Sequence, residues 1–267
     1  MRKGEGVRWF HRIRAFIMFR FSCQARARAL FSSIRAGAVL AFGLALLWHA
    51  PASAEPRDVP GQFDFYVLSL SWSPTYCEAQ GEKAGKDAQC NRERPYAFVV
   101  HGLWPQYERG APANCVYPAP YVPNSTLKAV MDIMPSRGLA IHQWRKHGTC
   151  SGLSAERYFE TLRDAREHVV VPTQFQRLEQ YRTLSPDELE AAFIAANPGL
   201  KRNMMAVSCD KHRLREVRIC MSRDLAFRPC GEVDRRACRL NRMVMPPVRA
   251  KAEPPSSSWL PNWFPRW

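Results

Sequence analysis

The sequence predicts one exported, disulfide-containing α+β domain over residues 55–240 of the 267-residue chain. Three observations support this expectation. Segments with strand and helix periodicity are interspersed, without the regular alternation that a parallel α/β fold requires. An apolar run near the N-terminus ends in a small-residue motif that is typical of signal cleavage. The chain beyond it contains eight cysteines, an even number that favours disulfides.

The first 54 residues have the features of a secretory signal. Basic residues dominate 1–35, an apolar run of about 13 residues follows, and Ala52-Ser53-Ala54 forms an Ala-x-Ala site, so cleavage is expected after Ala54. The run is shorter than the ~20 residues of a membrane span, which disfavours an uncleaved anchor. Met18 is an alternative start. The expected location is periplasmic or secreted, without stable membrane insertion.

Much of the positive charge belongs to this N-terminal segment. The whole chain has a formal charge of +15. Nine of its 39 basic residues and one of its 24 acidic residues lie in residues 1–54, which leaves 30 basic and 23 acidic residues, or +7. A surface of this charge attracts polyanions but does not by itself indicate one.

The first two strands are expected near the start of the domain. Residues 62–72 have apolar side chains on both alternating faces, which predicts a strand buried on both sides and ended by Pro74. The polar segment 78–94 predicts a loop. A short second strand is expected to end at Val100.

Three helices and a late strand are expected further on. One helix would begin at Asn124-Ser125 and stop before Pro135, and another would cover 154–168. Ser185 to Glu188 forms a capping box with a proline at the first helical position, which begins a third helix. Alternating apolar residues over 215–221 predict the late strand.

A fourth helix, over 139–147, would display a polar face. At about 100° per residue, His142, Gln143, Lys146 and His147 lie on one side, and Trp144 points the other way into the core. Gly148 is expected to end this helix as a left-handed cap.

This polar face and His101 together indicate acid–base chemistry, although each histidine alone is more often structural. The five-residue spacing of His142 and His147 does not fit the i, i+4 pair of zinc sites, and Lys146 would repel a cation, so neither metal nor cofactor is expected. Cleavage of RNA by its own 2′-hydroxyl fits better. One imidazole removes a proton, the other donates one, and a lysine stabilises the phosphorane charge. Trp104 could stack a base.

Three segments, residues 63–77, HGLWPQ (101–106) and HQWRKHGTC (142–150), resemble the signature segments of the ribonuclease T2 family. The resemblance extends from Phe63 to Cys238. It implies a single α+β domain with a central antiparallel sheet flanked by helices. It also implies a monomeric, metal-independent endoribonuclease that cleaves single-stranded RNA through a 2′,3′-cyclic phosphate to 3′-phosphate ends. DNA, which lacks the 2′-hydroxyl, would not be cleaved.

The resemblance also implies roles for individual residues. His101 would be the general acid and His147 the general base, although the two roles could be exchanged. His142, Gln143 and Lys146 would act on the phosphate, while the nucleotide would contact Trp104, Pro74, Thr75 and Gln106. The implied disulfides are Cys77–Cys90, Cys115–Cys150, Cys209–Cys238 and Cys220–Cys230.

One departure from the family pattern concerns Gln143, where the family usually has glutamate. Glutamine can bind a phosphate oxygen or orient a neighbour, but it cannot transfer a proton. A catalytically impaired module that only binds RNA or another polyanion is therefore the alternative function. The Pro- and Trp-rich residues 241–267 are expected to form a flexible tail, and membrane association through Trp259, Trp263 and Trp267 is a further alternative.

Overall fold

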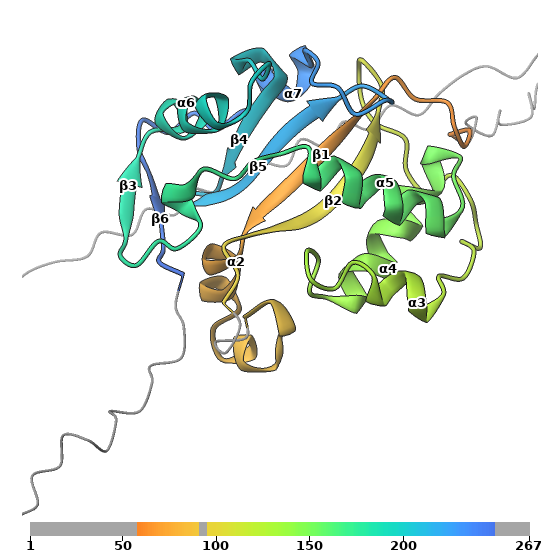
Figure 1. Cartoon of the computed structure of the whole chain (residues 1–267), viewed down its shortest axis with the longest axis horizontal. Coiled ribbons are helices and arrows are strands. Elements are labelled where there is room, and N and C mark those ends of the chain that lie inside the picture. The colour runs from red at the N-terminus through yellow and green to blue at the C-terminus, as the bar shows by residue number, and fades with distance from the viewer. Residues whose placement is uncertain (1–57, 91–94, 249–267) are drawn as a thin grey trace, which may run out of the picture. The chain divides into compact units, whose positions relative to one another are not determined.

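The computed structural model describes residues 58–90 and 95–248 and confirms the α+β class. A four-stranded antiparallel sheet has the strand order β2-β1-β5-β4, and a second sheet pairs β3 with β6 (Figure 1). The strands are β1 (Phe65–Trp72), β2 (Phe98–Gln106), β3 (Arg182–Leu184), β4 (Met205–Cys209), β5 (Leu214–Met221) and β6 (Met243–Met245). The helices are α2 (Ser73–Gln80), α3 (Asn124–Lys128), α4 (Arg137–Lys146), α5 (Ala155–Glu167), α6 (Pro186–Ala196) and α7 (Gly231–Arg235). The expected signal segment and the three tail tryptophans lie outside the described residues.

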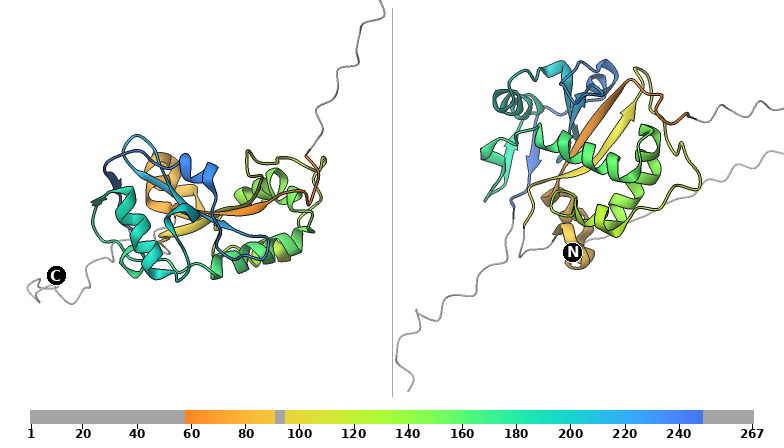
Figure 2. Two further views of the ribbon diagram at one scale, coloured as in Figure 1. Left: turned by 90° about the horizontal axis from the view of Figure 1, so that it is seen from above. Right: turned by 45° about the vertical axis from the view of Figure 1, so that its right-hand side comes forward.

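The central strand β1 is buried on both faces, as its sequence predicts. On one face Leu68, Leu70 and Trp72 join the main core, which also includes apolar residues of α5 and α6. Figure 1 and the right-hand view of Figure 2 show α5 lying across β1 and β2. On the other face, Phe65 and Val67 belong to a smaller cluster with the Cys220–Cys230 disulfide. The large core lies on one side of the sheet, so the remainder of the opposite side is free for polar groups.

The second strand is longer than expected. It continues through HGLWPQ to Gln106, whereas the sequence suggested an end at Val100. Its register with β1 shifts between Ser69 and Leu70, which pair with Gly102 and Val100, so His101 is an extra residue in the ladder. Such a β-bulge changes which residues share a face. His101 and Trp104, three positions apart, would lie on opposite faces of a regular strand, but the bulge permits both to face the same side.

The helices differ from expectation mainly at their ends. Residues 78–90 are not a loop: α2 begins directly after β1, and short 3-10 turns follow it. Helix α3 stops at Lys128, well before Pro135. Helix α6 has the predicted capping box, since the Ser185 hydroxyl accepts from the Glu188 amide and the Glu188 carboxylate accepts from the Ser185 amide.

The folded domain extends past the boundary expected at Leu240. Strand β6 pairs with β3, and both Met243 and Met245 are fully buried. The Trp72 indole donates a hydrogen bond of 3.1 Å to the Pro246 carbonyl. Residues 241–248 are therefore part of the domain, and of the expected tail only 249–267 lie outside the described residues.

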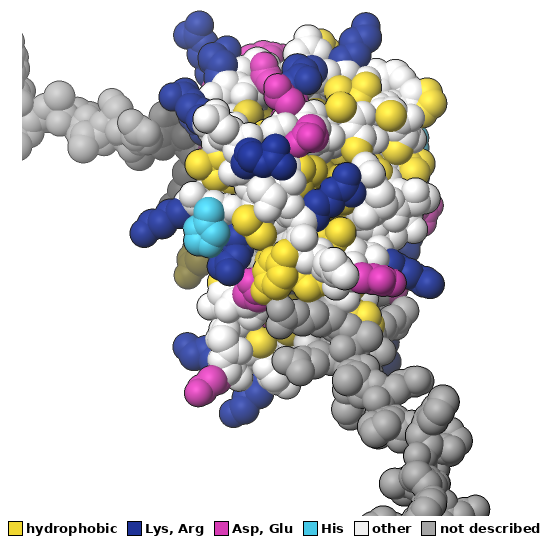
Figure 3. All heavy atoms as spheres, turned by 90° about the vertical axis from the view of Figure 1, so that its left-hand side faces the viewer, with side chains coloured by type: hydrophobic (Ala, Val, Ile, Leu, Met, Phe, Trp, Pro, Cys, Tyr) yellow, Lys and Arg dark blue, Asp and Glu magenta, His cyan; other side chains and the backbone are white. Residues whose placement is uncertain are grey.

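The surface carries charges of both signs. On the side of the molecule shown in Figure 3, Lys and Arg side chains project from much of the surface, with Asp and Glu side chains between them. Within the described part of the chain, none of the helices is long and apolar enough to cross a membrane.

Candidate active site

The polar face of the sheet is built around two small residues of the central strand. Ser71 of β1 pairs with Glu216 of β5, and Ser69 pairs with Arg218 of β5 on one side and Gly102 of β2 on the other. Serine side chains are short. Longer side chains from the two neighbouring strands, β2 and β5, can therefore meet above β1 without steric conflict.

His101 contacts a buried carboxylate across this gap. Its Nδ1 lies 2.6 Å from Glu216 Oε1, and Glu216 is only 4% exposed. The other carboxylate oxygen, Oε2, accepts two hydrogen bonds from Arg218, of 3.0 and 2.8 Å. Burial alone would raise the pKa of Glu216, but the hydrogen bond and charge of His101, together with Arg218, lower it to about 2. The carboxylate is therefore ionised over the usual pH range.

Trp104 lies between the two histidines that the sequence singled out. Its ring centroid is 5.5 Å from that of His101 and 5.4 Å from that of His147. The Arg218 guanidinium lies over the indole, 5.4 Å from its centroid. Trp104 is therefore more than the base platform expected from the sequence, because it contacts both imidazoles and a cation.

Helix α4 brings the second group of residues to the sheet. It begins at Arg137, two residues earlier than predicted, and Ser136 caps it by accepting from the Leu139 amide. Gly148 does not cap it in a left-handed conformation; it starts a 3-10 turn, and Gly152 has the positive φ of +75°. A Cβ at Gly148 would clash with Trp144 and Tyr158, so this glycine is needed for close packing.

His147, at the end of α4, is held in its neutral form. Burial, followed by the nearby charges of Lys146, His142 and His101, lowers its pKa from 6.5 to about 3. Its Nδ1 is buried and has no hydrogen-bond partner among the described residues. A buried carboxylate lies beside His101, whereas the charges that act on His147 within the described chain are those of Lys146, His142 and His101. The two imidazoles therefore have opposite electrostatic surroundings.

The four polar residues predicted to share one face of this helix are not equally accessible. His142 and Lys146 are exposed and His147 is half-buried, whereas Gln143 is only 3% exposed. The Gln143 side-chain oxygen accepts a 2.7 Å hydrogen bond from the Trp104 indole. The sequence suggested that this glutamine binds a phosphate oxygen or orients a neighbouring residue. The hydrogen bond to Trp104 agrees with the second of these functions.

Gly102 makes this contact possible. A Cβ built there would overlap both the Gln143 amide oxygen and the Trp104 indole nitrogen. The backbone at Gly102 does not have a positive φ. The missing side chain of Gly102 therefore gives Gln143 room to reach Trp104.

The segment between β2 and α3 is fastened to the end of α4. Asn114 donates its amide hydrogen to the Lys146 carbonyl at 2.8 Å, and the neighbouring Cys115 is bonded to Cys150. The structure contains all four implied disulfides: Cys77–Cys90, Cys115–Cys150, Cys209–Cys238 and Cys220–Cys230.

Two hollows flank the side chains of His101 and Trp104. The larger, about 410 Å³, is lined by His101, Glu216, Thr75, Asp210 and Arg215, among others. Thr75 is 5% exposed, and its hydroxyl has no partner among the described residues. The smaller, about 100 Å³, is bordered by Trp104, Gln106 and Arg218.

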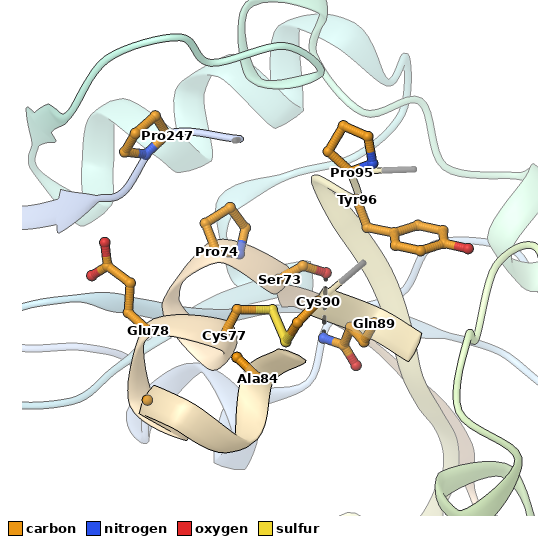
Figure 4. Close-up of a pocket in the computed structure, with 11 residues that line it drawn as sticks. Ser73, Pro74, Cys77, Glu78, Ala84, Gln89, Cys90, Pro95, Tyr96 and Pro247 are labelled. Carbon is orange, nitrogen blue, oxygen red and sulfur yellow. Dashed lines mark hydrogen bonds between the residues drawn. A yellow bond between two sulfur atoms is a disulfide. The ribbon is translucent and has the colours of Figure 1, made fainter. Parts of the chain in front are cut away.

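Pro74 lies elsewhere. It borders a third hollow of about 260 Å³ beside the Cys77–Cys90 disulfide, with Tyr96 and Pro247 on the opposite wall (Figure 4). None of the candidate histidines lines this hollow. The structure therefore brings Thr75 and Gln106 to the walls of the flanking hollows, but not Pro74.

No group of three or more His, Cys, Asp or Glu side chains in the described regions is arranged to hold a metal ion. The candidate site is an arrangement of imidazoles, one carboxylate, cations and an amide.

Two residues of this site, Glu216 and Arg218, were missed by sequence reasoning. That reasoning followed Val217, Ile219 and Met221, the apolar face of the late strand. The sequence carried a weak signal, because Glu216 and Arg218, of opposite charge, follow one another on the other face of that strand. Charged side chains on a buried strand are rare unless they are paired.

Comparison with known proteins assigns the chain to a family. Residues 63–230 match the sequence model of the Ribonuclease T2 family, so the chain belongs to that family. A protein named "Ribonuclease" from Aeromonas hydrophila is 37% identical over 134 residues, which cover 48% of this chain and 57% of that protein. A "Probable ribonuclease" from Haemophilus influenzae is 34% identical over 156 residues, or 54% of each. The chain thus spans about half the length of these curated relatives.

The fold is also found among solved structures. Trichomaglin, described as a novel S-like ribonuclease, aligns with a TM-score of 0.56 at 18% identity. The alignment covers 70% of this chain and 99% of trichomaglin. At this identity the likeness establishes the fold alone.

Proposed function

We propose that this protein is an exported, metal-independent endoribonuclease that cleaves single-stranded RNA by attack of the 2′-hydroxyl on the adjacent phosphate. A 2′,3′-cyclic phosphate forms and is then hydrolysed to a 3′-phosphate. The observation that carries the proposal is the opposite electrostatic surroundings of two imidazoles, both about 5.5 Å from the Trp104 ring. Membership of the Ribonuclease T2 family supports the substrate class.

His147 is the general base in this mechanism. With its pKa lowered to about 3, the ring is neutral at the pH of most RNA assays and can accept the 2′-hydroxyl proton. Its lack of a carboxylate partner keeps it from holding a proton before the reaction.

His101 is the general acid. The ionised Glu216 at Nδ1 compensates a positive charge on its ring, and the other ring nitrogen remains to protonate the departing 5′-oxygen. This asymmetry supports His101 as the acid and His147 as the base, rather than the reverse assignment that the sequence left open.

The phosphate is bound by the exposed cations of α4. Lys146 and His142 lie beside His147, and their charges already influence its ring. Cations at this point stabilise the charge that gathers on the phosphorane oxygens. Gln143 does not transfer a proton; it orients Trp104, which contacts both imidazoles.

The two hollows provide places for the flanking nucleosides. The 5′-oxygen of the leaving nucleoside separates from phosphorus and takes a proton from His101, so this nucleoside belongs in the larger hollow, which His101 lines. The unpartnered Thr75 hydroxyl is available to that nucleoside. The nucleoside that keeps the cyclic phosphate belongs beside Trp104 and Gln106, which border the smaller hollow.

Cleavage of a single-stranded RNA in excess EDTA tests this proposal. The expected result is undiminished cleavage by the wild-type protein, no cleavage of the DNA of the same sequence, and nearly complete loss of activity in His101→Ala and His147→Ala. Binding of RNA without any product between pH 4 and 8 would support the alternative of a binding module instead. Activity that disappears with EDTA would contradict the metal-free mechanism.

A further inference from the structure

The Glu216 carboxylate has no role in the mechanism as the sequence implies it, yet it makes the shortest contact to either candidate histidine. We propose that Glu216 is a positioning residue that fixes the tautomer of His101 and balances the positive charge of its ring. This inference rests on the proposed function, because it assigns Glu216 to the general acid of that reaction.

Geometry supports a dedicated contact. Glu216 reaches His101 from β5, across the intervening strand β1, where Ser71 is its cross-strand partner. A larger residue at position 71 would stand between them. A neutral imidazole bonded to a carboxylate through Nδ1 must carry its hydrogen there, because an ionised carboxylate only accepts hydrogen bonds. The tautomer is thereby set, and Nε2 is left toward the hollow where the leaving group would lie.

Arg218 completes the arrangement on the far side of the carboxylate. Its two hydrogen bonds occupy Oε2, so the carboxylate cannot rotate away from His101 without breaking them. The same guanidinium lies over Trp104, which itself contacts His101 edge to face. Glu216 and Arg218 therefore couple the orientation of the acid to that of the tryptophan.

Other charges surround His101 as well. His147 on α4 is close enough for the charge of His101 to lower its pKa, while Asp210 and Arg215 line the same hollow as His101 and Glu216. Glu216 is nevertheless the only carboxylate in the described chain that forms an ion pair with His101. We therefore expect the effect of removing the Glu216 charge to be visible in the pH dependence of the reaction.

The test compares Glu216→Gln with wild type in the pH dependence of kcat/KM on a dinucleotide. Glutamine can still accept a hydrogen bond from Nδ1 but has no charge. An opposite charge at this distance typically shifts a neighbouring titration by one to three units. We expect the alkaline limb of the profile to move to lower pH by about one unit or more, and kcat/KM at pH 7 to fall about tenfold or more. Below about pH 4 the two enzymes should differ little.

Glu190→Gln is the matched control. Glu190 is also buried, at 5% exposure, and is also paired with an arginine, Arg202, but it lies on α6 away from the histidines. This variant should keep the wild-type pH profile even if it loses stability. A Glu216→Gln profile that superimposes on that of wild type, or a shift of the acidic limb alone, would overturn the proposal.

A spectroscopic readout on the wild-type protein removes the dependence on a folded variant. Long-range ¹H–¹⁵N correlation spectra above the titration of His101 should show its neutral ring with the hydrogen on Nδ1. A ring with the hydrogen on Nε2 would overturn the inference. The tautomer of His101 can be measured whether or not RNA is cleaved. The proposed function therefore has its own test, since it fails if the wild-type protein yields no cyclic phosphate.

Discussion

The indole nitrogen of Trp104 donates a 2.7 Å hydrogen bond to the side-chain oxygen of Gln143, and this bond joins the catalytic face of the sheet to helix α4. The indole thereby lies between a ring from β2 and a ring from the end of α4. The bond therefore links the strand that carries His101 to the helix that His147 follows.

Replacement of Gln143 distinguishes orientation from proton transfer. Gln143→Leu leaves the Trp104 indole without its acceptor, which should cost about 1–3 kcal/mol of unfolding free energy and lower kcat/KM strongly. Gln143→Glu retains an acceptor and should keep the stability close to that of wild type. Urea unfolding and steady-state kinetics on the two variants provide the measurement. Equal stability of Gln143→Leu and wild type would show that the bond contributes nothing.

Gly102→Ala tests the close approach of the two side chains. The added methyl group would overlap the Gln143 amide and the Trp104 indole, and overpacking of this kind typically costs ~1–3 kcal/mol. The matched control is Gly138→Ala in α4, where a Cβ meets no atom within 4 Å. Alanine in a helix should there be neutral or stabilising. If thermal unfolding shows the same change for both variants, crowding at Gly102 is not the cause.

The Cys115–Cys150 disulfide should matter for both stability and activity. The bond closes a sequence separation of 35 residues and joins Cys115 to the turn that follows His147. Its removal in a Cys115→Ala, Cys150→Ala double variant should cost ~2–4 kcal/mol and reduce kcat. Cys209–Cys238, with a separation of 29, is the comparison of similar loop length. Removal of Cys209–Cys238 should lower the free energy of unfolding by a similar amount. At a temperature where both variants remain folded, however, kcat should fall only in the variant that lacks Cys115–Cys150.

The lowered pKa of His147 predicts a loss of stability in acid. In the unfolded chain this ring binds a proton near pH 6.5, whereas in the folded protein it does so near pH 3. The stability that the neutral ring contributes is therefore complete above pH 6.5. Between pH 6.5 and 3 the unfolded chain binds a proton at this ring that the folded protein does not, so the free energy of unfolding falls by about 1.4 kcal/mol for each unit that the pH decreases. Glu216, lowered from 4.5 to about 2, adds a loss between those values.

Urea unfolding at half-unit pH steps measures this dependence. His147→Gln should flatten the slope between pH 6.5 and 4.5, where Glu216 does not yet contribute. An unchanged slope in this variant would mean that the ring is not held neutral by the fold.

Features that depend on residues close together in the sequence were predicted correctly, whereas features that depend on pairing between distant strands were missed. The capping box at Ser185 and the burial of β1 depend on residues near one another in the chain, and both were correct. The continuation of β2 through Gln106 was missed, because Gly102 and Pro105 read as strand-ending residues until the pairing with β1 is known.

The candidate site shows the same division. The histidines were found because they stand in short, specific motifs. Glu216 was not found, because its contact with His101 joins positions 115 residues apart and passes over a small serine of a third strand. The tertiary arrangement alone reveals that contact.

The central claim is that two differently charged imidazoles cleave RNA through its 2′-hydroxyl. Mass spectrometry of the products from one defined single-stranded RNA, sampled over time in excess EDTA, tests it most directly. Attack by the 2′-hydroxyl predicts that fragments ending in a 2′,3′-cyclic phosphate appear first and are then converted to 3′-phosphates. A 2′-deoxy substitution at one nucleotide should prevent cleavage immediately after it. Fragments ending in a 3′-hydroxyl, or cleavage after the deoxynucleotide, would contradict it.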